Sequence, residues 1–288
     1  MLDIIAFPLG KILKLIYDSI AFQNYGVAIV MFTILIKSFM LPLNHRQFLS
    51  THKMKEVQPQ IQLIQDTYKN DREQLNIEIM NIYKENRINP ASGCLPIFVQ
   101  LPILLSLYYV ISQPLKYMFG KSQETILTLY NLIPDGAARY ANMKDISILS
   151  YFNNNTNEIF NVSHLLKLDE LINLNFLGIN LGIIPSLNPD YYLTNNAGMS
   201  PFLILLIPIL SFITSYLSMK YSSQDTPTVD DNSFQKSIQR NMLLLAPIMS
   251  GVIAFTVPAG LGLYWIVSNI YQIFQQILLE YSMKLKKR

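Results

Sequence analysis

Apolar residues gather into five long runs along the chain, separated by stretches in which polar and charged residues dominate. Pro258 and Gly260 separate the last two runs and predict a tight turn at a membrane edge. Each run has the length, about 17–25 residues, that a helix needs to cross roughly 30 Å of hydrocarbon. The runs, which predict five transmembrane helices, occupy residues 25–43, 94–113, 199–219, 241–257 and 259–279.

The first residues carry a weaker apolar pattern. Ile12, Leu15 and Ile16 recur at helical spacing, while Lys11 and Lys14 lie off that face. An acidic residue precedes the apolar stretch and no small-residue cleavage site follows it, which does not fit a signal peptide. We expect a retained amphipathic helix that lies in the membrane interface.

Residues 44–90 have the pattern of a helical hairpin with a narrow apolar stripe on a charged body. Pro59 predicts a kink or restart in the first helix, and Asn70, three residues before Glu73, is a candidate N-cap of the second. Two interpretations stay open: the two stripes bury one another, or part of the stripe meets a partner or lipid. The stripe consists of Met54, Val57, Ile61, Ile64 and Tyr68 in the first helix and Leu75, Ile79 and Ile82 in the second.

Composition agrees with a membrane protein, because 51% of the residues are hydrophobic and only 14% are charged, against about 25% charged residues in a soluble domain. The net charge of +3 is too small to indicate a nucleic-acid partner. A single cysteine excludes an internal disulfide bond, and the three histidines are scattered. We therefore expect no metal site and no cofactor.

Basic residues indicate the orientation. Lys and Arg number seven in residues 44–90, three in 220–240 and four in the tail 281–288, whereas residues 114–198 hold five of them with seven acids. The positive-inside rule then places the first three segments in the cytoplasm and the N-terminus outside. The external segment is polar and asparagine-rich, and it is too long for a bare connection, so we expect short helices within it.

Together these patterns predict an all-α integral membrane protein with five transmembrane helices, a cytoplasmic helical hairpin and an N-terminal interfacial helix. The expected order is an interfacial amphipathic helix (1–22), the first span (23–43), the cytoplasmic hairpin (44–90), the second span (91–117), an extracytoplasmic loop region (118–198), the third span (199–220), a cytoplasmic loop (221–240), the fourth span (241–257), the fifth span (259–280) and a basic cytoplasmic tail (281–288).

Lys37 is the one charged residue inside the five runs. A cation near the middle of a bilayer costs about 2.5–3.5 kcal/mol on insertion scales, so the fold or the function has to make it tolerable. The runs hold no Asp, Glu or His, which argues against an ion-coupled transporter and against intramembrane aspartyl or metal proteases.

Uncharged polar residues in the runs share helix faces. They are either cross-helix hydrogen-bond partners, at roughly 0.6 kcal/mol per bond, or the lining of a water-accessible cavity that Lys37 faces. We favour the cavity, because a lysine accompanies amide side chains such as Gln276 in a small bundle. The candidate substrate-groove residues are Lys37, Thr33, Gln100, Ser211, Thr214, Ser215, Ser218, Trp265, Asn269 and Gln272; we expect no catalytic residue.

Three segments carry a family resemblance. "KMKEVQPQIQLIQDTYKND", "IYKENRINPASGCLPIFVQLPILLSLYYVI" and "VPAGLGLYWIVSNIYQIFQQ" resemble, in order and spacing, the signature blocks of the YidC/Oxa/Alb membrane protein insertases. The similarity covers about residues 20–117 and 171–288 and is to the shorter, Gram-positive-type bacterial members. The external loop at about 120–170 is longer than is usual in the family.

The resemblance implies a bacterial plasma-membrane insertase that works without nucleotide, alone or beside the Sec translocon. It implies a five-helix core around a hydrophilic groove open to cytoplasm and lipid, with the basic residue of the first span inside. Lys37 has that position, where most members have arginine. Nascent membrane proteins are the expected clients, and the ribosome is a candidate partner of the basic tail residues Lys284, Lys286, Lys287 and Arg288.

Two other classes of function remain. A small anion-selective transporter or channel could use Lys37, although no internal repeat relates the two halves of the chain. An assembly scaffold would use the helices only to pack on partner proteins. No sequence feature favours an enzyme.

Overall fold

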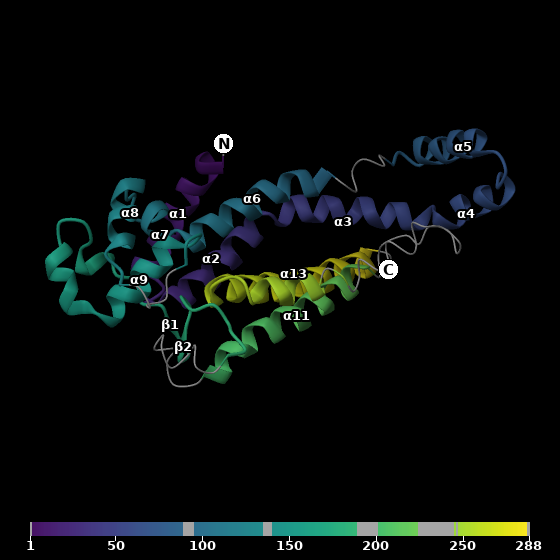
Figure 1. Ribbon diagram of the computed structural model, residues 1–288. Coiled ribbons are helices and arrows are strands. Elements are labelled where there is room, and N and C mark those ends of the chain that lie inside the picture. The colour runs from purple at the N-terminus through teal and green to yellow at the C-terminus, as the bar shows by residue number, and fades with distance from the viewer. Residues whose placement is uncertain are drawn as a thin grey trace.

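The computed structural model describes residues 2–88, 95–134, 140–188, 201–223, 245 and 247–286 (Figure 1). Residues 95–100, 201, 202, 223 and 284–286 are described by their backbone alone. Helices dominate the described residues, in agreement with the all-α prediction, and a single two-stranded hairpin accompanies them. The helices that arise from the apolar runs are α2 (Tyr25–Phe39), α6 (Leu95–Ser112), α11 (Pro201–Ser223), the helical residues 247–254 and α13 (Ala259–Lys286).

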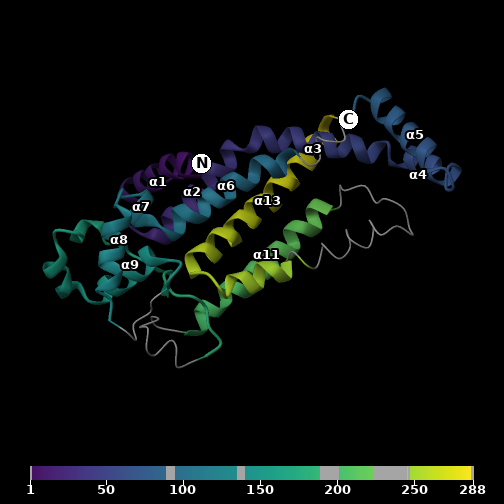
Figure 2. The ribbon, with the colours of Figure 1, turned by 45° about the horizontal axis from the view of Figure 1, so that its top comes forward.

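The ends of these helices meet at one end of the molecule. The Tyr25 hydroxyl at the start of α2 donates to the Ile111 carbonyl near the end of α6, at 2.8 Å. Backbone N–H groups of Ala259 and Gly260, at the start of α13, donate to the carbonyls of Ile183 and Leu181. Successive apolar helices therefore alternate in direction, and Figure 2 shows α11 and α13 side by side along their length.

Length and composition identify fewer spanning helices than expected. Among the described residues, Leu203–Ser222 is the one stretch long and apolar enough to cross a membrane. A second candidate arises if α2 and α3 (Leu41–Glu56), which meet at an angle of 55°, count as one broken span, and Leu101–Ser112 is a shorter apolar helix. Five spans thus remain a prediction, and the expected fourth span and cytoplasmic loop fall partly at residues 224–244, outside the described residues.

Several expected boundaries differ from the helices. The first span was expected to reach residue 43, but α2 ends at Phe39 because Pro42 lies in the first turn of α3 and cannot continue the preceding helix. The second span was expected to reach residue 117, but α6 ends at Ser112 before Pro114. The fifth span was expected to end at residue 280, whereas α13 continues through Lys286.

The helical hairpin, which was expected in the cytoplasm, consists of α3, α4 (Gln58–Thr67) and α5 (Arg72–Glu85). In Figure 1, α4 and α5 extend away from the other helices, whereas α3 begins beside α6 and α13. The predicted restart at Pro59 is confirmed, since α4 begins one residue earlier. The N-cap of α5 is Asp71 and not Asn70; its carboxylate accepts from the Gln74 N–H at 3.0 Å. Burial of the stripes against one another is confirmed for most of their residues, with Tyr68 and Leu75 outside the cluster. The cluster consists of Val57, Ile61, Ile82 and Ile88, flanked by Met54, Ile64, Ile79 and Tyr83.

The N-terminal helix α1 (Leu2–Ser19) packs on α6 and α2 with a face that agrees only in part with the predicted one, since Ile16 is buried and Ile12 is half-buried. Leu15, which was expected on the apolar face, is 66% exposed. A Cβ on Gly10 would lie 2.4 Å from the Tyr117 carbonyl oxygen, so the close contact of α1 with the segment that follows α6 needs glycine. The buried face consists of Ala6, Gly10, Leu13, Ile16 and Tyr17.

Residues 114–134 and 140–188 fold into a cap over the common end of the helices. The expected short helices are confirmed, and the hairpin of β1 (Asn175–Phe176) and β2 (Ile179–Asn180) was not predicted. The Asp145 carboxylate is buried inside the cap and accepts from the Lys116 N–H at 2.9 Å. Burial raises the pKa of Asp145 to about 6. The helices of the cap are α7 (Pro114–Tyr117), α8 (Gln123–Asn131), α9 (Lys144–Asn154), η2 (Thr156–Val162) and η3 (Leu168–Glu170).

Candidate functional site

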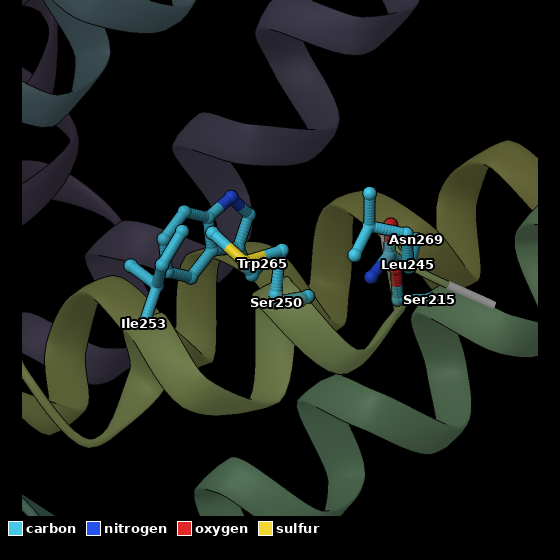
Figure 3. A pocket seen from close by; sticks show the side chains of 7 residues that line it. Ser215, Leu245, Ser250, Ile253, Trp265 and Asn269 are labelled. Carbon is cyan, nitrogen blue, oxygen red and sulfur yellow. The ribbon is translucent and has the colours of Figure 1, made fainter. Parts of the chain in front are cut away.

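A cavity of about 430 Å³ lies between α11, α13 and the helical residues that precede α13. Figure 3 shows Trp265 and Ile253 toward one end and Ser215, Leu245 and Asn269 toward the other. Leu245, Met249 and Ile253 line it on the preceding helix at steps of four residues, so they form one apolar wall. Ser215 and Asn269 add polar groups from α11 and α13. The complete lining is Ser215, Leu245, Met249, Ser250, Ile253, Trp265 and Asn269.

Glycines bring the helices around the cavity close together. A Cβ on Gly262 of α13 would lie 2.2 Å from Ile207 Cγ2, so that α11 could not approach as closely if the residue were larger. A Cβ on Gly251 would lie 3.3 Å from Phe212 Cβ. Small residues at helix interfaces are the usual means of close packing in membranes.

The polar faces predicted for α11 and α13 meet at this interface. The Asn269 amide nitrogen and the Thr214 hydroxyl lie 3.4 Å apart, and the Thr214 hydroxyl also donates to the Leu210 carbonyl at 2.7 Å. Ser211 and Ser218 are buried nearby on α11, and the Ser211 hydroxyl has no hydrogen-bond partner among the described residues. The interface therefore combines a hydrogen bond between the two helices with a polar-edged cavity.

Thr33, Lys37 and Gln272, which were also predicted for the groove, are not among the residues that line this cavity. Thr33 is buried in α2 and its hydroxyl donates to the Ile29 carbonyl at 2.6 Å, while Gln272 is exposed. The side chain of Gln100 lies outside the described residues. The structure thus joins Ser215, Trp265 and Asn269 at the cavity and leaves the residues of α2 elsewhere.

Lys37 lies near the end of α2, twelve residues after Tyr25, which corresponds to roughly 18 Å along a helix. Its side chain is partly exposed. Within the part of the chain that the structure describes, its ammonium group makes no hydrogen bond or ion pair. The next residue, Ser38, does form a hydrogen bond, since its hydroxyl oxygen lies 3.0 Å from that of Tyr271.

A second polar face of α13 was missed. Tyr271 contacts Ser38, and the Asn44 amide donates to Gln275 Oε1 at 3.2 Å, so α13 is tied to α2 and α3 on either side of the bend at Met40. The predicted face consists of Trp265, Asn269, Gln272 and Gln276, at steps of four, three and four residues. The second face has the same steps one position earlier, at Tyr264, Ser268, Tyr271 and Gln275. This spacing is the sequence feature from which the second polar face could have been predicted.

No group of three or more His, Cys, Asp or Glu side chains forms a candidate metal site within the described ranges. The site consists of polar contacts inside an apolar helix bundle.

Comparison with known proteins identifies the family. The family model described as 60Kd inner membrane protein matches residues 16–287. The chain belongs to this family, the YidC/Oxa/Alb insertases. Membership makes it a bacterial inner membrane protein.

Several YidC insertases are similar to the chain over nearly its whole length. Membrane protein insertase YidC of Oceanobacillus iheyensis is 28% identical over 92% of this chain and 78% of its own length. The YidC protein of Caldanaerobacter subterraneus subsp. tengcongensis is 29% identical over 95% of this chain and 93% of its own. With YidC of Pelobacter propionicus the match spans 96% of this chain but 38% of the relative, so YidC proteins of very different length share this region.

Proposed function

We propose that the protein is a membrane protein insertase and chaperone, which inserts nascent membrane proteins and helps them fold through a hydrophilic groove open to cytoplasm and lipid. The observation that carries the proposal is the polar-edged cavity between α11 and α13, which would receive polar groups of a client inside the bilayer. The names of its relatives agree with this activity.

The surfaces beside the cavity support a route into lipid. Each helix that flanks it has exposed apolar side chains, among them Ile209 and Ile213 on α11 and Ile270 and Phe274 on α13. A client helix that leaves the groove along these surfaces would bury its apolar area at roughly 25 cal/mol per Å². That free energy can drive insertion without nucleotide.

Lys37 would act on the polar part of the client. A partly exposed cation without a described partner attracts acidic groups more strongly in a partly desolvated site than in water. An acidic tail that enters from the cytoplasm would therefore pause near Lys37, and its polar groups would have a shorter hydrophobic distance left to cross. Nascent membrane proteins would be the clients, and the Sec translocon and the ribosome are candidate partners.

The proposed topology has the N-terminus outside and the basic tail in the cytoplasm. The alternating direction of the apolar helices and the common end beneath the cap support it. A reporter inserted after Ala259, at the start of α13, should then face outward. A cytoplasmic position of that reporter would overturn the topology.

Photocrosslinking to stalled nascent chains tests the groove. A photoreactive residue at Asn269 or Ser215 should capture the polar flank of a single-span client, whereas one at Ile270 should capture its apolar segment from the lipid side. Leu149, buried in the cap, provides the matched control. Crosslinks at Asn269 no stronger than those at Leu149 would refute the groove.

The anion transporter is the alternative, and the partly exposed, unpaired Lys37 favours it. Reconstituted vesicles separate the functions: an insertase places a single-span client in liposomes that contain only this protein, while a transporter carries an anion flux that Lys37→Ala abolishes. Insertion in such liposomes would also exclude a pure assembly scaffold.

A further inference from the structure

Two of the most exposed large apolar side chains in the described residues lie near the start of α2. Phe22, in the loop between α1 and α2, is 91% exposed, and Leu177, in the turn between β1 and β2, is 81% exposed. Ile20, in the same loop as Phe22, is 50% exposed. We call Ile20, Phe22 and Leu177 the apolar rim.

The rim is held in a fixed backbone conformation. Phe22 and Leu177 have positive φ angles of 51° and 52°, a region that bulky residues rarely adopt and that persists when surrounding contacts determine it. In the loop, the N–H groups of Ala21, Gln23 and Asn24 donate to the carbonyls of Ile16, Tyr17 and Ala21. Because the loop is ordered by these hydrogen bonds, flexibility does not explain why the Phe22 ring is exposed.

Both segments are tied to the first turn of α2. The Asn24 amide donates to the Asn175 carbonyl at 2.7 Å, and the Tyr25 N–H donates to the Asn173 carbonyl at 3.0 Å. A Cβ on Gly26 would lie 2.2 Å from the ring of Phe176, so the hairpin rests directly on α2. The rim is thereby continuous with the point at which the first apolar helix begins.

The distribution of charge distinguishes the segments that hold the rim from the middle of the cap. Residues 19–36 and 171–189 contain no Asp, Glu, Lys or Arg. Residues 140–170, in contrast, contain Lys144, Asp145, Glu158, Lys167, Asp169 and Glu170. Exposed apolar groups without charges fit the headgroup and acyl boundary of a membrane, where Phe and Leu on an interfacial segment insert.

We propose that the apolar rim inserts into the lipid at the end of the first span and anchors the cap to the bilayer surface. The occupant is phospholipid, because the rim continues the surface of a helix that begins an apolar run in a bacterial inner membrane protein. The inference is separate from the insertase function, since it concerns the end of α2 away from Lys37.

Spin labels measure the depth of the rim. The only cysteine, Cys94, is first replaced by serine, and single cysteines are then placed at Phe22, Leu177 and, as a control, Phe160. Phe160 is also apolar and 78% exposed, but it lies in η2 within the charged part of the cap. In phosphatidylcholine and phosphatidylglycerol liposomes, labels at 22 and 177 should collide with oxygen and avoid a water-soluble nickel chelate, and the label at 160 should do the reverse.

Two other results of the accessibility measurement would contradict the proposal. Nickel accessibility at 22 and 177 equal to that at 160 means that the rim lies in water. Protection from both reagents means that protein, such as a second copy of the chain, covers the rim.

A second measurement does not depend on labels. Asparagine tolerates positive φ, so Phe22→Asn with Leu177→Asn keeps the backbone and removes the apolar groups. A lipid anchor predicts that this double variant lowers the unfolding temperature in liposomes but leaves it unchanged or raised in detergent, while Phe160→Asn changes it in neither. An unchanged or raised unfolding temperature in liposomes as well would contradict lipid insertion.

Discussion

Gly262→Ala tests how closely α11 and α13 pack in the bilayer. The new Cβ would lie 2.2 Å from Ile207 Cγ2, well inside van der Waals contact. Overpacking of this kind costs about 1–3 kcal/mol, and the better helix propensity of alanine offsets about 1 kcal/mol of it. We expect a net loss of folding free energy of up to about 2 kcal/mol, measured by reversible unfolding in mixed micelles.

A matched variant and a double-mutant cycle isolate the cause. A Cβ on Gly260, on the same helix, would lie at an ordinary 3.5 Å from Ile29 Cδ1, so Gly260→Ala should be neutral or stabilising. Ile207→Ala makes room for the Cβ, and the pair with Gly262→Ala should therefore show a coupling of about 0.5–3 kcal/mol. Additive effects, or a Gly262→Ala variant as stable as Gly260→Ala, would refute the close packing.

Three further predictions follow from single features of the fold. If Lys37 attracts clients, Lys37→Ala and more strongly Lys37→Glu should impair insertion of acidic-tailed substrates and spare neutral-tailed ones, while Lys37→Arg retains insertion; an equal loss for all tails, parallel to a loss of thermal stability, would indicate a structural role. Because the folded pKa of Asp145 is about 6, its contribution to stability is fully present below about pH 4 and is lost as the pH rises through 6. In Asp145→Asn, the unfolding free energy should no longer fall by this amount, on the order of 3 kcal/mol, as the pH rises from about 4 to above 6. The same pH dependence in the variant would contradict this. Amides of α4 and α5 should exchange hydrogen faster than those of α2, since only a small cluster of side chains buries the hairpin; equal protection would count against this.

The sequence predicted those parts of the fold that depend on local chemistry. Pro59 marked the restart of α4 because proline is suited to a first helical turn, and the spacing of Val57, Ile61 and Ile82 indicated which faces of the hairpin meet. The same logic applied to Pro42 would have ended α2 at the right place. Asp71 replaced Asn70 as the N-cap because two adjacent residues both have suitable side chains.

The features that the sequence did not predict depend on contacts between residues far apart in the chain. Periodicity identified polar faces on α11 and α13 but not their partners. Of the residues predicted for one groove, Ser215, Trp265 and Asn269 line the cavity, and Lys37 and Thr33 are not among its lining residues. Leu15 has the hydrophobicity of a core residue, but the close crossing at Gly10 turns it outward. The hairpin at Leu177 depends on a positive φ angle at a residue other than glycine, which no local pattern announces.

The bonds between the cap and the starts of α2 and α13 bear on how the protein itself is made. Synthesis proceeds from the N-terminus, so α2 emerges long before Asn173, whose carbonyl accepts from the Tyr25 N–H. The carbonyls that accept from the N–H groups of Ala259 and Gly260 have already been synthesised when α13 emerges. The start of α2 therefore forms before its hydrogen-bond acceptor has been synthesised, whereas the start of α13 docks onto acceptors that are already present. During its own biogenesis this chain passes through the kind of half-assembled state that an insertase is proposed to shelter in others.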